Sequence, residues 1–353
     1  MTFDRGRRDL RVDVVRGLAL LSMYVAHCAP TGGPAGVLTL SEYLTYPLFA
    51  ALVGGGAQLS DRRLIGPGSF QVWRTVAVRG AVLVGLGLLL EQAGAQVVIV
   101  LVHLGLLTWV AAPLARARTS VVAAVATAAY VLAPMVHDAL LVHRGQLMGE
   151  DSSTQLRVLD LLVTGQSYRL SSMIFFAALG ILLTRLLLDC GTTTQLRGGL
   201  VLAGFAGLLL VADRADLVTL AAYDTTHAEH LLDALLVSAV FLLGVALAAL
   251  APRSTRSLAA IGQMSLTLYA AQISWLAYEV TVLHPGSRDD SWVNVTILVS
   301  GSFLLALAWR TSVRREVWRR GPLEGLTALL AGTTRRPAES PRPGLQPPPR
   351  LVP

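Results

Sequence analysis

The sequence predicts an all-α fold, a polytopic membrane helix bundle of about ten transmembrane helices, and three observations support this. Hydrophobic residues make up 54% of the 353 residues and charged residues 14%. The mean hydropathy of +0.59 lies outside the range of soluble globular domains. Apolar runs long enough to cross the hydrocarbon core recur along the chain, near 12–29, 40–60, 74–91, 95–114, 119–136, 168–189, 198–213, 231–250, 257–281 and 291–309.

Arginines gather in alternate connections between these runs, which predicts the topology. The positive-inside rule then places both termini in the cytoplasm and makes the number of spans even. The formal charge of +7 therefore orients the chain in the membrane, and nucleic-acid binding is not expected. The chain has arginine as its only strongly basic residue and is rich in Ala, Leu, Val and Gly, which indicates a GC-rich bacterial genome. We expect a multi-pass protein of a bacterial plasma membrane.

The domain organisation follows from the same pattern. Residues 1–330 form one transmembrane domain, and the Pro- and Arg-rich residues 331–353 form a disordered cytoplasmic tail. Glycine- and proline-rich turns at 32–36 and 66–68 follow the first two spans. Residues 314–330 are typical of a basic amphipathic segment on the cytoplasmic face. Whether 155–165 forms an additional surface or re-entrant element stays open.

The first span carries three ionisable groups, Asp13, Arg16 and His27. A charge at bilayer depth is costly and is kept mainly where it faces a protein interior or a water-filled cavity. At 100° per residue these three side chains share one narrow arc, with Arg16 and His27 roughly 16 Å apart along the helix axis. We expect the other spans to close around this face.

A second polar stripe lies on the ninth span, where Ser265, Tyr269, Gln272 and Glu279 share one face with Leu276. In the hydrocarbon region such polar side chains form hydrogen bonds with one another or with water. The first and ninth spans are therefore predicted to line a shared cavity. The alternative is that these residues only hold helices together.

His27 is the candidate catalytic residue, because a neutral imidazole takes a proton from a hydroxyl or amine as it attacks a carbonyl. Glu42 enters the second span on the same external side and is its candidate partner. His103, in the outer half of the fourth span, is a candidate for lining the same cavity. Alternatively, His27 is an interfacial histidine that is hydrogen-bonded to a loop carbonyl. Glu42 would be an ordinary interfacial acid, and His103 would have a structural role.

Arginines around the second and third spans are candidates for donor binding. With Arg16, the cluster of Arg62, Arg63, Arg74 and Arg79 suits the phosphates of a cytosolic nucleotide-like donor, which guanidinium groups bind through bidentate hydrogen bonds. Topology signalling and contact with anionic lipid are the alternative, favoured for Arg62 and Arg63.

No metal is expected. His227, Glu229 and His230 lie close in sequence, but two histidines without a defined third ligand are a weak metal signal. Asn294 begins a glycosylation acceptor motif, which we discount in a bacterial protein.

Several short motifs occur in an order that resembles the integral-membrane acyltransferase family that includes heparan-alpha-glucosaminide N-acetyltransferase and its bacterial relatives. The motifs are Asp13-Val-Val-Arg16-Gly17, Pro47-Leu-Phe-Ala-Ala-Leu-Val-Gly54, Trp73-Arg74 to Arg79-Gly80, Gly262-Gln-Met-Ser265-Leu-Thr-Leu-Tyr269-Ala-Ala-Gln272 and Arg320-Gly-Pro-Leu-Glu324. The first motif also opens the related family-three acyltransferases, in which His27 matches a first-helix histidine. Two departures are the absence of histidine from residues 29–39 and the presence of Gln272 where family-three enzymes often have histidine.

The resemblance implies transfer of an acyl group, usually acetyl from acetyl-CoA, to a sugar hydroxyl or amine. The expected partners are thus membrane lipid, acyl-CoA and an envelope carbohydrate or glycolipid. His27 would act as general base, and Arg16, Arg74 and Arg79 would contact the donor. A transporter of a small anionic or lipid-linked metabolite is the main alternative, and a non-catalytic membrane scaffold is the third.

Overall fold

The computed structural model describes residues 9–30, 34–63, 69–149 and 153–332, and within these ranges the chain is helical without strands. The elements are, in order, α1 (Leu10–Cys28), η2 (Pro34–Thr39), α2 (Leu40–Arg63), α3 (Ser69–Glu91), α4 (Leu101–Leu114), α5 (Thr119–Gly149), α6 (Ser153–Leu159), η3 (Asp160–Thr164), α7 (Leu170–Leu186), α8 (Thr192–Arg214), α9 (His227–Leu250), α10 (Arg256–Gln263), α11 (Ser265–Tyr278), η4 (Glu279–Leu283), α12 (Trp292–Ser312), η5 (Trp318–Arg320) and α13 (Pro322–Leu330). Of the predicted tail at 331–353 and the predicted turns at 32–36 and 66–68, residues 333–353, 32–33 and 66–68 lie outside the described residues.

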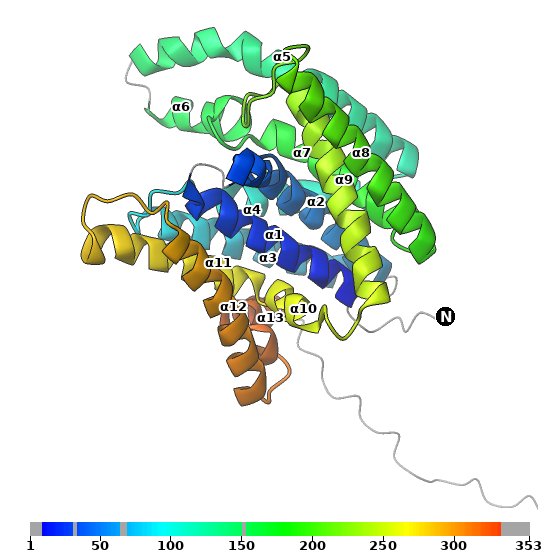
Figure 1. Ribbon diagram of the computed structural model, residues 1–353, viewed down its shortest axis with the longest axis vertical. Helices are drawn as coiled ribbons and strands as arrows, with labels where there is room; N and C mark the ends of the chain where they lie inside the picture. The colour runs from blue at the N-terminus through cyan, green and yellow to red at the C-terminus, as the bar shows by residue number, and fades with distance from the viewer. Residues whose placement is uncertain (1–8, 31–33, 64–68, 150–152, 333–353) are drawn as a thin grey trace, which may run out of the picture.

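The first helix lies inside the bundle. Figure 1 shows α1, in dark blue, running between α2, α9 and the α10–α12 segment. The helix begins where the Asp9 carboxylate accepts a hydrogen bond from the Arg11 amide, which satisfies one of the open donors of the first turn. Leu20 and Met23, on the predicted arc, are at most 1% exposed. The other helices therefore close around α1.

Small residues let the helices approach α1 and α2 closely. A Cβ atom at Gly262 of α10 would overlap the backbone oxygen of Asp13 in α1, and one at Gly180 of α7 would overlap that of Ala51 in α2. Where lipid gives little hydrophobic drive between helices, such backbone approach supplies the packing contacts. These two crossings join α1 and α2 to the rest of the bundle.

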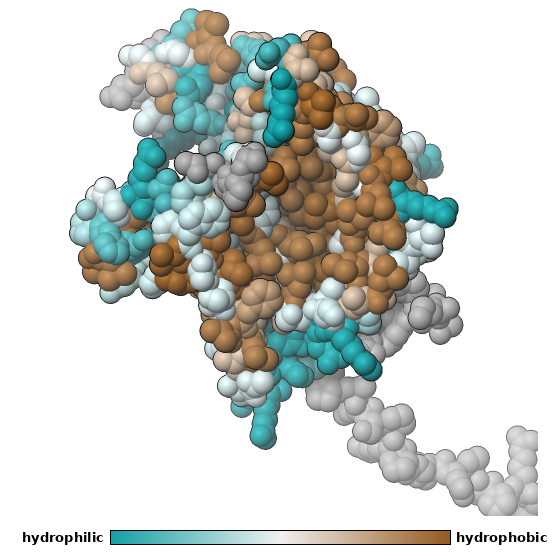
Figure 2. Space-filling model, viewed as in Figure 1, coloured by the Kyte–Doolittle hydropathy of each residue, from teal (hydrophilic) through white to brown (hydrophobic). Residues whose placement is uncertain are grey.

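The outer surface suits a hydrocarbon environment. Large apolar side chains are exposed on α3, α8 and α12, such as Leu89, Leu208 and Leu304, each at least 63% exposed. Figure 2 shows a broad hydrophobic face over α8 and α9. By length and composition, six helices can cross a membrane, namely α2, α3, α5, α8, α9 and α12, while α4 and α7 are shorter apolar helices. The described residues thus form a helical membrane bundle, and ten spans with cytoplasmic termini stay predictions.

Three elements differ from the predicted spans. Helix α4 begins only at Leu101, because the chain before it turns through Gly94 at φ 79°. Helix α5 continues to Gly149, beyond the predicted end at 136, and carries Pro134 inside it. The predicted continuous span 257–281 is interrupted at Met264, which separates α10 from α11. Residues 155–165, left open above, form most of α6 and all of η3.

A carboxylate from the C-terminal region stabilises the interruption at Met264. Glu324 of α13 accepts hydrogen bonds from the amides of Leu266 at 2.8 Å and Thr267 at 3.1 Å, and from the Thr267 hydroxyl at 2.5 Å. These are first-turn amides of α11, which have no partner within their own helix. Burial raises the pKa of Glu324, while the three donors favour its charged form. The segment 314–330 is therefore fixed to α11 through α13.

The bundle has two ends, which organise the functional groups. At the histidine end α1 terminates and α2, α4, α7 and α9 begin, and there Tyr46 of α2 meets Asp233 of α9. At the arginine end α2 and α7 terminate, and there Gln58 accepts a hydrogen bond from Arg185. Most described arginines belong to this second end, namely Arg11, Arg74, Arg79, Arg116, Arg118, Arg185, Arg197, Arg253, Arg256, Arg310, Arg314, Arg315, Arg319 and Arg320.

The Gly262→Ala substitution tests the α1–α10 crossing. The added methyl overlaps the Asp13 carbonyl, so the helices must separate, which we expect to lower the free energy of unfolding by about 1–3 kcal/mol. Thermal unfolding in detergent measures the effect. Gly207→Ala on α8 is the matched control, because its Cβ meets open space. Equal melting temperatures for the two variants would contradict close packing at Gly262.

The Glu324→Ala substitution tests the cap on α11. Loss of the acceptor leaves two amides and a hydroxyl without their partner, and we expect a loss of about 1–3 kcal/mol together with faster tryptic cleavage between residues 314 and 320. Glu324→Gln keeps one acceptor oxygen and should show a smaller change. Cleavage at the wild-type rate in Glu324→Ala would show that α13 is held by other contacts.

Candidate functional site

The polar faces predicted on the first and ninth spans meet at His27. His27 lies in the last turn of α1 and is half-buried, and its Nδ1 is 2.8 Å from Nε2 of Gln272 in α11. Gln272 is 1% exposed. This contact joins two segments separated by 245 positions.

The orientation of the Gln272 amide decides what His27 can do. With the amide nitrogen donating to Nδ1, a neutral imidazole carries its proton on Nε2 and acts there as a donor. Gln272 Oε1 is buried and has no partner among the described residues. A half-turn of the amide lets Oε1 accept from Nδ1–H, which leaves Nε2 with the lone pair that a general base needs.

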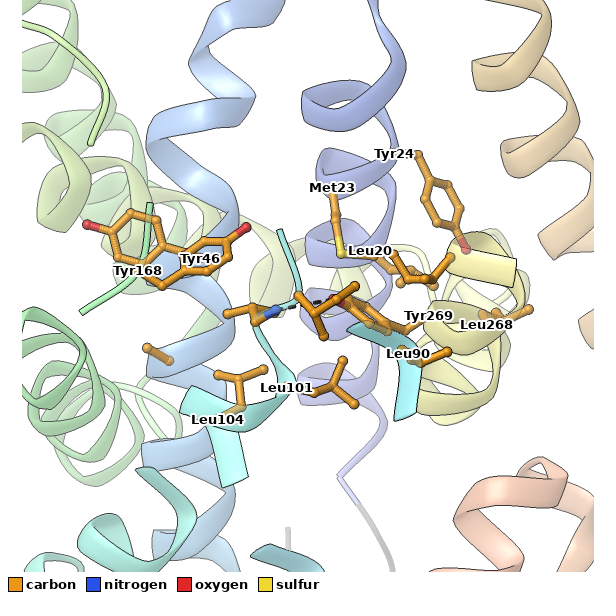
Figure 3. Packing of buried hydrophobic residues seen from close by; sticks show 14 of the residues in the cluster. Leu20, Met23, Tyr24, Tyr46, Leu90, Leu101, Leu104, Tyr168, Leu268 and Tyr269 are labelled. Carbon is orange, nitrogen blue, oxygen red and sulfur yellow. Dashed lines mark hydrogen bonds between the residues drawn. The ribbon is translucent and has the colours of Figure 1, made fainter. Parts of the chain in front are cut away.

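The predicted companions of His27 have other contacts. No hydrogen bond joins His27 to Glu42 in the described part of the chain, and Glu42 lies half-buried at the start of α2. Tyr269 accepts a hydrogen bond from the Val100 amide at 3.3 Å, which Figure 3 draws as a dashed line. Glu279 accepts from the Asn294 side chain.

Asn294, which begins the glycosylation acceptor motif, is a buried residue whose side-chain amide links α11, η4 and the segment before α12 by hydrogen bonds. It is 1% exposed, and its amide oxygen accepts from the indole of Trp275 at 3.1 Å. Its nitrogen donates to Glu279 and to the Asp289 carbonyl.

Two residues of the stripe predicted on the ninth span remain. Ser265 is the first residue of α11 and is half-buried, and Leu276 is fully buried.

His103 belongs to an aromatic cluster rather than to the His27 contact. Both ring nitrogens of His103 are buried without a hydrogen-bond partner among the described residues, and its ring meets Tyr168 edge-on at 5.9 Å. Tyr46 contacts Tyr168 and stacks with Tyr223, each with ring centroids 5.8 Å apart. Figure 3 shows Tyr46 and Tyr168 next to each other at α2. A fourth pair, Phe176 and His230, stacks with ring centroids 5.7 Å apart.

Two buried acids lie against this cluster, one turn apart on α9. Glu229 is 1% exposed and accepts backbone hydrogen bonds from Tyr223 and Thr225, each at 2.5 Å. Both loop residues have positive φ, 68° and 60°, so Glu229 holds a strained turn. Asp233 is fully buried, and the Tyr46 hydroxyl is its partner at 3.5 Å.

Sequence reasoning missed Asp233 and considered Glu229 and His230 only as metal ligands. The available signal was an acid inside the apolar run 231–250, which is costly in hydrocarbon and marks a functional position. No group of three His, Cys, Asp or Glu side chains in the described ranges has the arrangement of a metal site.

A buried arginine completes the cluster. Arg169 immediately precedes α7 and is 5% exposed. Its Nη2 donates to the carbonyls of Tyr223 at 2.8 Å and Gln166 at 3.2 Å, and its Nε has no partner among the described residues. Arg169 is thus a cation held by backbone oxygens instead of by a carboxylate.

A small pocket with a cavity volume of about 60 Å³ lies at the arginine end, between α2, α3 and α4. Arg79 and Arg116 line it together with Trp73. The Arg116 guanidinium lies 4.9 Å above the Trp73 ring, and its Nε donates to Asp61 at 3.0 Å. The other lining residues are Val53, Ala57, Ser60, Asp61, Val72, Thr75, Val76, Thr108 and Ala112.

The predicted donor arginines separate in the structure. Arg79 lines the pocket, whereas Arg74 donates to the Leu330 carbonyl at 3.3 Å and so holds the end of α13. Arg16 pairs with Asp13 at 2.7 Å, one turn away on α1, and Asp13 is 1% exposed. The side chains of Arg62 and Arg63 lie outside the described part.

The Glu229→Ala substitution tests the strained turn. Without the carboxylate, the amides of Tyr223 and Thr225 lose their acceptor, so we expect hydrogen–deuterium exchange of the 220–226 peptide to accelerate. Glu42→Ala, at the same end of the bundle, should leave that peptide unchanged. Unaltered exchange in Glu229→Ala would show that the turn is held by its own backbone.

Comparison with known proteins adds no assignment to these contacts. No family model, no curated protein and no solved structure matches the chain. The functional proposals below therefore rest on the geometry of the two ends and on the sequence motifs.

Proposed function

We propose that the protein is a membrane acyltransferase of the bacterial plasma membrane, with the arginine end in the cytoplasm. It moves an acetyl or other short acyl group from acyl-CoA to a hydroxyl or amine of an envelope carbohydrate or glycolipid. The observation that carries the proposal is the contact between His27 and Gln272. It places an oriented imidazole between the two helices whose motifs resemble the acyltransferases.

The donor is proposed to bind at the arginine-end pocket. Acyl-CoA is cytosolic and carries phosphate groups, which guanidinium groups recognise by charge-assisted, often bidentate, hydrogen bonds. Arg79 and Arg116 supply such groups, and the Trp73 ring supplies a flat apolar surface. Of the arginines that the sequence predicts to contact the donor, Arg79 is retained in this assignment, and Arg116 is added. Arg16 and Arg74 instead make contacts within the helix bundle, with Asp13 and with the Leu330 carbonyl.

The proposed reaction takes place at His27. Nε2 accepts the proton of the acceptor hydroxyl as its oxygen bonds to the thioester carbonyl carbon. The C–S bond then breaks, and the thiolate of CoA takes the proton from the imidazolium. After the half-turn of its amide, the Gln272 carbonyl accepts from Nδ1–H and holds the ring in the tautomer that this step requires.

A second candidate is a transporter of a small anionic or lipid-linked metabolite. The specific observation in its favour is Arg169, a buried cation bonded only to backbone oxygens in the described residues and therefore able to bind an anion. Flux through proteoliposomes without any acyl donor distinguishes this activity from acyl transfer.

The acyltransferase proposal is tested with protein in nanodiscs, labelled acetyl-CoA and isolated envelope glycolipids. His27→Ala should reduce transfer by roughly 10²–10⁴-fold and leave CoA binding intact, because it removes only the base. Arg79→Ala should instead weaken CoA binding, whereas Arg288→Ala, a highly exposed arginine at the other end, should not. Wild-type protein that neither binds CoA nor hydrolyses acetyl-CoA would refute the proposal.

A further inference from the structure

A line of three ionisable side chains enters the bundle at the histidine end. Glu42 and Tyr46 are one turn apart on α2 and therefore share a face of that helix. The Tyr46 hydroxyl continues the line to Asp233 at 3.5 Å. Exposure decreases along it, from half-buried Glu42 to 3% for Tyr46 and 0% for Asp233.

Asp233 is buried without a cation beside it. Its Oδ2 faces Tyr46, and its Oδ1 has no partner among the described residues. The nearest strong cation of the cluster, Arg169, directs Nη2 at backbone carbonyls. In such surroundings an ionised carboxylate is far more costly to bury than the neutral acid.

The groups next to Asp233 also favour its neutral form. Glu229, one turn earlier on α9, is oriented by two backbone amides, which favour its negative charge. A second charge at Asp233 would be repelled by the first. The ionisable groups that act directly on Asp233 are Tyr43 and Tyr46 of α2, Tyr223 of the connecting loop and Glu229 of α9. Further out, the groups that act on these four include Glu42 of α2, Arg169 before α7, Asp213 of α8 and Asp224 of the loop, and His230 lies one turn before Asp233 on α9.

We propose that Asp233 is a proton-exchange site that communicates with the histidine end through Tyr46 and Glu42. In one transfer the Tyr46 hydroxyl gives its proton to the Asp233 carboxylate and regains one from the Glu42 side. Tyr46 is neutral before and after, and one proton moves inward. The site is separate from the His27–Gln272 contact, and it holds whether the protein transfers acyl groups or transports a metabolite.

Infrared spectroscopy of the reconstituted full-length protein tests this site. At neutral pH the wild type should show the carbonyl stretch of a protonated carboxylic acid, which shifts when the sample is moved into D₂O. Asp233→Asn should remove this band. Asp289→Asn is the matched control, because Asp289 is also a buried acid with one unpartnered oxygen in the described residues, and it should leave the Asp233 band in place.

Two further variants keep Asp233 and test the proton route through Tyr46 and Glu42. They keep the proposal testable if the Asp233→Asn variant does not fold. Tyr46→Phe keeps the acid but removes its hydrogen-bond partner, so the band should remain, shift in frequency and exchange severalfold more slowly. Glu42→Gln should slow the exchange without moving the band. The proposal is overturned if the band persists in Asp233→Asn, if no such band occurs in the wild type, or if exchange is equally fast in Tyr46→Phe.

Discussion

Buried polar groups in a low-dielectric interior must find partners, and this constraint organises the bundle. Asp13 meets Arg16 on its own helix, His27 meets Gln272 from another, and Tyr24 meets Ser302 of α12 at 2.7 Å. Each contact satisfies a group that would cost several kcal/mol if left alone. The position of α1 inside the bundle agrees with this, because the arc that carries Asp13, Arg16 and His27 faces other helices.

Close helix packing is what makes these polar contacts possible. The Gly262 and Gly180 crossings bring backbones together where lipid alone would not draw helices into contact. Backbone groups find side-chain partners at the arginine end too. There Arg185 donates hydrogen bonds to the Ala115 and Ala117 carbonyls, which follow the last turn of α4. Arginines at this end therefore hold helix ends as well as lining the pocket.

Much of the helical pattern followed from hydrophobic runs, and the meeting of the first and ninth spans followed from their polar stripes. The break at Met264 did not, because the carboxylate that caps α11 comes from Glu324, far along the chain. The role of Arg74 also depended on a partner that spacing does not reveal, the Leu330 carbonyl, whereas the i,i+3 spacing of Asp13 and Arg16 could have indicated their pair. Asp233 could have been flagged as an acid in an apolar run, but its contact with Tyr46 required the packing of α2 on α9.

The proposed chemistry depends most directly on the orientation of the His27 imidazole by Gln272. Nitrogen-15 NMR of the reconstituted protein with labelled histidine measures it most directly, because the Nδ1 and Nε2 shifts report tautomer and hydrogen bonding. The account predicts that Gln272→Ala changes the Nδ1 shift of His27 and that Glu42→Gln leaves it unchanged. A Nδ1 shift that responds to Glu42→Gln but not to Gln272→Ala would contradict the account.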